Sequence, residues 1–191
     1  FCAAGSLLIS LGVNEASPSV ENFLSRISSH MTLYPSGLIK HSDAYFLSVR
    51  PYSRVKSLAR LFKNTLHRNA LYMKSIGYHA FNTYALAIIE GTLPNCHISS
   101  NVVVMDSLKY LMGSEFDSLI SKSPYGFPYN PPGIEVAFTI KTFFPQYQEL
   151  ITYWLERQFS ETYNQNTKQL DLKVADPTTG AARIYEACRL L

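Results

Sequence analysis

The sequence predicts an all-α fold of antiparallel helix pairs arranged in two layers. Three observations lead there. Apolar residues recur at helical spacing along most of the 191 residues, no Asn-Gly or Asp-Gly hairpin turn occurs, and amphipathic segments alternate with more apolar ones. A helix that is apolar nearly all round is buried on most sides, whereas an amphipathic helix keeps one face in solvent. The alternation therefore indicates an inner and an outer layer, as in a solenoid arc or an (α/α) toroid.

The elements follow from this periodicity in chain order. Residues 1–12 are typical of the end of a buried helix. Amphipathic helices are expected over 20–31, 53–66, 101–112 and 146–160, and more apolar helices over 79–90, 134–144 and 181–191. Helix starts are marked by Ser53 and by Asp176 followed by Pro177, and helix ends by Gly91 and Gly113. Lys168–Val174 alternates enough for a short strand or an extended loop.

Composition limits the class of protein. With 47% apolar residues and a net charge of +3, the chain is expected to fold, and no apolar stretch is long enough to span a membrane. We expect one helical domain over 1–191 that belongs to a longer chain, because the sequence starts at Phe1 within an apparent helix. The remainder of that polypeptide, or other chains, would then be its partners.

The three cysteines, Cys2, Cys96 and Cys188, form no metal-binding or paired motif. We expect small buried thiols in a reducing compartment such as the cytoplasm, although the count alone also allows the periplasm. Phosphate-loop, Rossmann, G-x-S-x-G and H-E-x-x-H motifs are absent from the sequence. Their absence argues against nucleotide enzymes, α/β-hydrolases and zincins, and no cofactor is expected.

Three segments between or entering helices are rich in Tyr, His, Pro and Gly: 34–46, 77–79 and 123–133. The stretch GYHAFNTYALAIIEG resembles the inner helices of (α/α) toroid proteins that act on carbohydrates, and LYPSGLIKHSDAYF and YGFPYNPPGIEVAF are similar in character. Those families include polysaccharide lyases, unsaturated-sugar hydrolases and N-acylglucosamine epimerases. The resemblance covers 17–191 at the level of architecture. It implies a glycan lyase, hydrolase or epimerase, with Tyr, His and Asn at the cleft end of the inner helices.

His79 is the first candidate for chemistry. It is expected to start the buried helix beside Tyr78, with Asn82 one turn further on. His79 as a base, Tyr78 as an acid and Asn82 as a partner for a substrate carboxylate would suit β-elimination from a uronic acid. The alternative is structural: His79 caps the helix and Asn82 bonds a neighbouring loop.

His41 and Asp43 form a second candidate pair. In an extended segment they lie on the same side and could act as a base with its orienting carboxylate. As metal ligands they would need a third residue, which the sequence does not identify, and no metal site is assigned. The alternative is a surface loop in which Asp43 caps a short helix.

The Pro-rich loop contributes aromatic side chains and a carboxylate. Tyr125, Phe127 and Tyr129 could stack on the apolar faces of a sugar, with Asn130 and Glu135 binding its hydroxyl groups. The same aromatic residues could simply pack, and a glutamate is favoured at a helix N-terminus in any case.

Positive charge gathers between Lys40 and Lys74, where eight Lys or Arg, including Arg50, face one Asp. Such a segment could bind an acidic polysaccharide or a nucleic-acid backbone, or it could be an ordinary solvated face. Three classes of function therefore remain open. They are a carbohydrate-active protein acting on or binding a sugar, an acidic one included; a non-catalytic helical interaction module; and a nucleic-acid-associated protein, for which no known binding motif is present.

Overall fold

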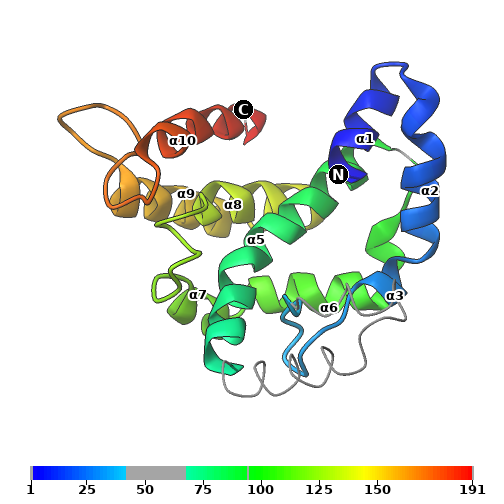
Figure 1. The fold of residues 1–191 in the computed structure, drawn as a ribbon, viewed down its shortest axis with the longest axis horizontal. Coiled ribbons are helices and arrows are strands. Elements are labelled where there is room, and N and C mark those ends of the chain that lie inside the picture. The colour runs from blue at the N-terminus through cyan, green and yellow to red at the C-terminus, as the bar shows by residue number, and fades with distance from the viewer. Residues whose placement is uncertain (1, 42–67, 94, 191) are drawn as a thin grey trace, which may run out of the picture.

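The computed structural model describes residues 2–41, 68–93 and 95–190 and is helical throughout its regular segments. The helices are α1 (Cys2–Ser10), η1 (Asn14–Ala16), α2 (Ser17–Ser25), α3 (Ile27–His30), α5 (Arg68–Thr92), η3 (Ile98–Ser100), α6 (Val102–Leu111), α7 (Ser114–Ile120), α8 (Pro132–Phe143), α9 (Gln148–Thr162), α10 (Pro177–Ala182) and η4 (Arg183–Leu190). Figure 1 shows the long helix α5 crossing the centre of the molecule. The predicted all-α class is confirmed.

The helices pack in pairs around α5. Helix α8 lies between α5 and α9, while α1 packs on the C-terminal half of α5 and pairs with α2 at the other side of the molecule (Figure 1). The larger core joins α5, α6, α7, α8 and α9 around buried side chains such as Ile76, Phe116 and Trp154. A second core, which includes Leu86 and Val104, joins α3, α5 and α6. Burial of these apolar faces is the main force that holds the pairs together.

Local signals account for several helix boundaries. The side chain of Asn101 accepts hydrogen bonds from the backbone N–H groups of Val103 (3.0 Å) and Val104 (3.4 Å), which caps the start of α6. Pro132 opens α8, where its missing N–H leaves no bond unmade. The predicted helices over 101–112, 134–144 and 146–160 correspond to α6, α8 and α9 within a few residues.

Four expectations about the elements are wrong. The helix expected at 79–90 starts eleven residues earlier, at Arg68, so the segment 77–79 is the middle of α5 and not a loop. Gly91 lies inside that helix and does not cap it in a left-handed conformation. The helix expected over 20–31 breaks at Arg26 into α2 and α3. Phe81, part of the apolar stretch that was expected to be buried on most sides, is 39% exposed.

Two further expectations concern Lys168–Val174 and the cysteines. Lys168–Val174 is neither a strand nor an extended loop: it consists largely of turns, with Lys168 and Lys173 at positive φ, and its Gln169 forms an isolated bridge with Asn164. The cysteines are free thiols, but Cys188 is exposed and the other two are only half-buried.

No helix among the described residues is long and apolar enough to cross a membrane. The helix expected over 53–66 and most of the basic residues between Lys40 and Lys74 lie outside the described residues.

Candidate functional site

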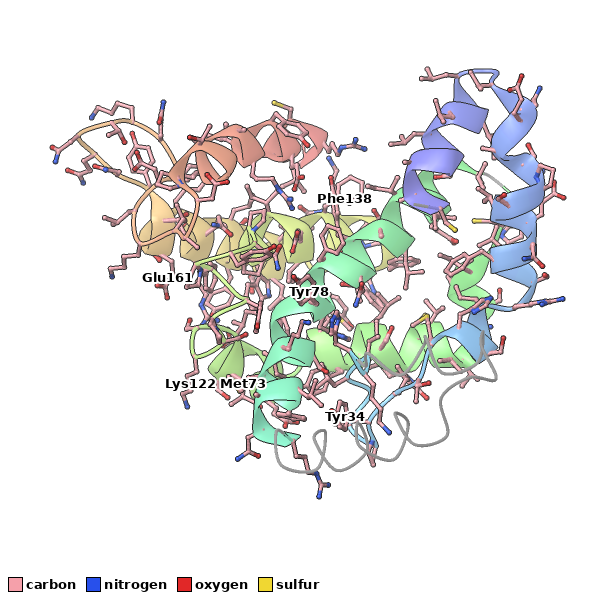
Figure 2. All side chains as sticks on the ribbon, in the orientation of Figure 1. Tyr34, Met73, Tyr78, Lys122, Phe138 and Glu161 are labelled. Carbon is pink, nitrogen blue, oxygen red and sulfur yellow. The ribbon has the colours of Figure 1, made fainter. Side chains whose placement is uncertain are left out.

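Four aromatic side chains from three separate segments meet on one side of α5, and we call them the aromatic cluster: His41, Tyr78, Tyr125 and Tyr129. Tyr78 projects from the middle of α5 (Figure 2). Its ring stacks on His41 at a centroid distance of 4.9 Å and lies 5.7 Å from Tyr125 and 6.0 Å from Tyr129. Residues from the three aromatic-rich segments therefore meet, but at the middle of α5 and not at the start of a buried helix.

The aromatic cluster forms because the Pro-rich loop docks directly on α5 at Gly77. A Cβ atom built on Gly77 would lie 2.4 Å from the Cβ of Tyr125, so only glycine permits this approach. Ser123 donates a hydrogen bond to the carbonyl of Met73 (2.7 Å), and the Asn130 amide donates to the carbonyls of Gly77 (3.3 Å) and Tyr125 (2.9 Å). These bonds fix the loop, and with it the tyrosines, before any ligand arrives.

The residue His41 is tied to the same helix. Its backbone N–H donates to the hydroxyl of Ser75 (2.9 Å), which in turn donates to the carbonyl of Leu71 (2.9 Å). Burial, followed by the neighbouring Tyr129 hydroxyl, raises the pKa of Tyr78 above its usual value. Tyr78 is therefore a neutral phenol at physiological pH. The ring of Tyr129 is the most open part of the cluster, because 57% of this residue is exposed.

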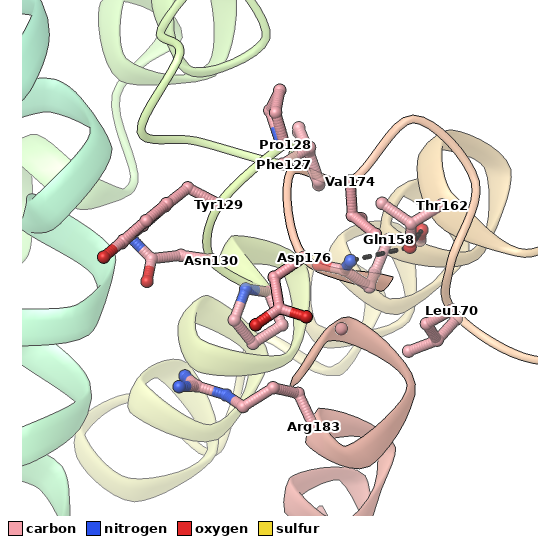
Figure 3. A pocket seen from close by; sticks show the side chains of 12 residues that line it. Phe127, Pro128, Tyr129, Asn130, Gln158, Thr162, Leu170, Val174, Asp176 and Arg183 are labelled. Carbon is pink, nitrogen blue, oxygen red and sulfur yellow. Dashed lines mark hydrogen bonds between the residues drawn. The ribbon is translucent and has the colours of Figure 1, made fainter. Parts of the chain in front are cut away.

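A cavity of about 230 Å³ opens beside the aromatic cluster, and we call it the loop cavity (Figure 3). Tyr129 belongs to both, and its neighbour Asn130 also lines the cavity. The other walls come from α9, through Gln158 and Thr162, and from the C-terminal segment, through Asp176 and Arg183. The Gln158 amide donates to the Thr162 hydroxyl (2.9 Å), so this wall is preformed.

Arg183, which lines the loop cavity, also contacts a carboxyl group in the protein interior. Arg183 is 21% exposed, and its Nη2 donates a 2.8 Å hydrogen bond to Oε1 of Glu135, a side chain with no exposed surface. Burial raises the pKa of Glu135 to about 8 although Arg183 opposes the shift. Glu135 was expected to bind substrate from the start of a helix. It does lie in the first turn of α8, but behind Arg183 and not in the cavity.

His79 occupies a different position from the one expected. Its side chain is completely buried in the middle of α5, with Tyr110 and Phe116 packed against the ring. Nδ1 accepts a hydrogen bond from the backbone N–H of Ile39 (3.3 Å), and Nε2 lies 3.0 Å from the carbonyl of Ser107. Both ring nitrogens are thus engaged, and burial lowers the pKa of His79 to about 4. A catalytic role for this residue stays a prediction that its surroundings do not favour.

The remaining predicted residues are distributed as follows. Asn82 does not share an opening with His79; it lines a second, largely apolar cavity of about 390 Å³ between α1, α2 and α5, together with Ile39. Phe127 is buried at the edge of the loop cavity. Asp43 and Arg50 lie outside the described residues. Within the described ranges, no group of three His, Cys, Asp or Glu side chains is placed to hold a metal ion.

The sequence pattern did not identify the polar residues that line the loop cavity and come after the Pro-rich loop in the chain. Arg183 and Gln158 are brought to it from η4 and α9, far along the chain. One signal was available, since Glu135 is a charged residue inside a stretch that is otherwise almost wholly apolar. Such a carboxyl group requires a cation or a proton, and Arg183 supplies the former.

Comparison with known proteins gives one informative match. Archaeal glycosylation protein Q from Haloferax volcanii is 32% identical over 207 aligned positions, which cover 100% of this chain and 54% of that protein. The chain thus spans about half the length of this curated relative. No protein-family model and no solved structure matches the chain. The match covers the aromatic cluster and the loop cavity alike.

Proposed function

We propose that this chain forms a sugar-binding part of a protein that assembles or modifies glycans. The observation that carries the proposal is the aromatic cluster, in which Tyr78, Tyr125 and Tyr129 converge beside a cavity whose wall includes Gln158, Asp176 and Arg183. Sugar rings have apolar faces that stack on aromatic side chains and hydroxyl groups that need hydrogen-bond partners. The name of the relative, a glycosylation protein, supports the same class of ligand.

In this proposal the sugar ring lies on Tyr129 and reaches into the loop cavity. Tyr129 is the exposed ring, and Asn130 and Arg183 lie within the same cavity. The ammonium group of Lys74 lies over Tyr125, 5.8 Å from the ring centroid, where it offers a cation to an acidic sugar. The helix pairs would belong to a larger (α/α) array that supplies the rest of the site. Lyase, hydrolase and epimerase chemistry all remain compatible with such a site.

The test is binding of glucose and glucuronic acid to the full chain, measured by saturation-transfer NMR. We expect both sugars to bind and Tyr129→Ala to weaken binding about 2- to 10-fold, since an aromatic contact contributes about 0.5–1.5 kcal/mol. Lys74→Gln should weaken the binding of glucuronic acid and leave the binding of glucose unchanged.

Tyr147→Ala serves as the matched control, because Tyr147 is also an exposed tyrosine (49%) but precedes α9, outside the aromatic cluster and the loop cavity. Equal losses from Tyr129→Ala and Tyr147→Ala, or no saturation transfer to either sugar, would refute sugar binding at this site.

A further inference from the structure

A buried group of charged side chains lies directly behind the wall of the loop cavity, where η4 packs on α8. It consists of Glu135 from α8 and of Arg183 and Glu186 from η4. Glu135 has no exposed surface and Glu186 is 5% exposed. The sugar-binding proposal makes no use of the two carboxyl groups.

Both carboxyl groups lie close to the guanidinium of Arg183. Oε1 of Glu135 accepts a 2.8 Å hydrogen bond from Nη2, and Oε1 of Glu186 lies 3.0 Å from Nε. Nε donates no hydrogen bond within the described residues, so its contact with Glu186 is an ion pair without a hydrogen bond. One cation therefore faces two carboxyl groups.

The second oxygen of each carboxyl group has no bonding partner. Oε2 of Glu135 and Oε2 of Glu186 are both buried, and neither has a hydrogen-bond partner among the described residues. A buried acceptor without a donor is costly, and two adjacent carboxylates repel each other as well. One proton placed on either carboxyl group removes one of the two buried negative charges.

We propose that Glu135 and Glu186 hold one proton between them and form, with Arg183, a buried titratable group behind the wall of the loop cavity. With one proton between them, the two carboxyl groups carry a single negative charge, which Arg183 balances. The buried group as a whole is then neutral, the state that burial favours.

The surroundings of the pair act in the same sense. Burial comes first among the causes that raise the pKa of Glu135, to about 8, and of Glu186, while Arg183 opposes both shifts and Arg189 opposes that of Glu186. Tyr84 faces the pair from α5, and burial followed by the charge of Glu186 raises its pKa to about 12, so it stays neutral. Glu135 therefore retains a proton at physiological pH.

A shared proton makes the contact between η4 and α8 sensitive to pH. Loss of that proton leaves the buried group with one net negative charge, which burial disfavours. The inference goes beyond the proposed function, and its test requires no sugar, so either can fail without the other.

The test is a pH titration of the glutamate side-chain carboxyl carbons by NMR on the full chain. In the wild type we expect two linked steps from the pair, with the upper midpoint near pH 8. Glu186→Gln removes the neighbouring charge, so Glu135 should titrate in one step, about one pH unit or more lower. Glu156→Gln, an exposed glutamate on α9, is the control and should leave both steps unchanged.

Two results would overturn the proposal: an unchanged Glu135 midpoint in Glu186→Gln, or a wild-type Glu135 that titrates near 4.5, its ordinary value. If Glu186→Gln does not fold, the shape of the wild-type curve decides. Linked steps support a shared proton, and two independent simple curves contradict it.

Discussion

At the residue scale, His79 illustrates how a polar side chain can serve the core. Its two ring nitrogens connect the segment before His41 with α6, through the backbone of Ile39 and Ser107. The tautomer that satisfies both contacts has its proton on Nε2, so the ring is neutral. His79 thus joins elements that are far apart in the sequence.

We therefore predict that His79→Ala destabilises the chain by about 3 kcal/mol, because it leaves a cavity and two backbone groups without partners. If His79 were instead a catalytic group at the start of a helix, as the sequence suggested, the same substitution would leave stability nearly intact. Thermal and urea unfolding followed by circular dichroism measure the change. Phe81→Ala, on the exposed side of the same helix, should cost less than half as much. A melting temperature of His79→Ala equal to that of the wild type would show that His79 is not a core residue.

At the scale of elements, the contact between α5 and the Pro-rich loop decides whether the aromatic cluster exists. It depends on the absence of a side chain at Gly77, where a Cβ atom would meet the backbone carbon of Tyr125 at 2.5 Å as well as its Cβ. Tyr125 and Tyr129 reach Tyr78 only while this contact is intact. The geometry of the proposed site is thus set by helix–loop packing.

Gly77→Ala should therefore destabilise the chain by about 1–3 kcal/mol through overpacking, although alanine favours helices over glycine by about 1 kcal/mol. Gly91→Ala is a matched control in the same helix, since a Cβ at Gly91 meets nothing within 4 Å. We expect Gly91→Ala to be neutral or stabilising. Chemical denaturation of the two variants compares them directly, and equal effects would mean that the loop does not need the glycine.

At the scale of the whole molecule, two buried titratable groups have opposite effects on how the free energy of unfolding changes with pH. The folded pKa of His79, about 4, lies below its ordinary value of 6.5, so its stabilisation is complete above pH 6.5 and is lost as pH falls through 4. The folded pKa of Glu135, about 8, lies above 4.5, so its stabilisation is complete below pH 4.5 and is lost as pH rises through 8. These two groups together favour mildly acidic conditions.

The measurable consequence is a fall in the melting temperature of the wild type between pH 6.5 and 8.5, the range in which His79 no longer titrates. Glu186, whose pKa is also raised, adds to the same trend. Glu135→Gln carries no ionisable group at this position and should show a much flatter profile over that range. Parallel profiles for wild type and variant would mean that Glu135 does not titrate there.

Local pattern was enough to predict the all-α class and most helices, because apolar spacing and capping residues such as Asn101 act within a few residues of one another. The same patterns indicated Tyr78, Tyr125 and Tyr129 as candidates, but their meeting at the middle of α5 depends on the packing at Gly77. Only the tertiary structure decided which polar residues are buried, since that depends on contacts far along the chain. Arg183 reaches Glu135 across 48 positions, and Ile39 meets His79 across 40. A one-dimensional pattern records neither partner, so the exposed Tyr129 and the buried Glu135 became distinguishable only when the helices were packed.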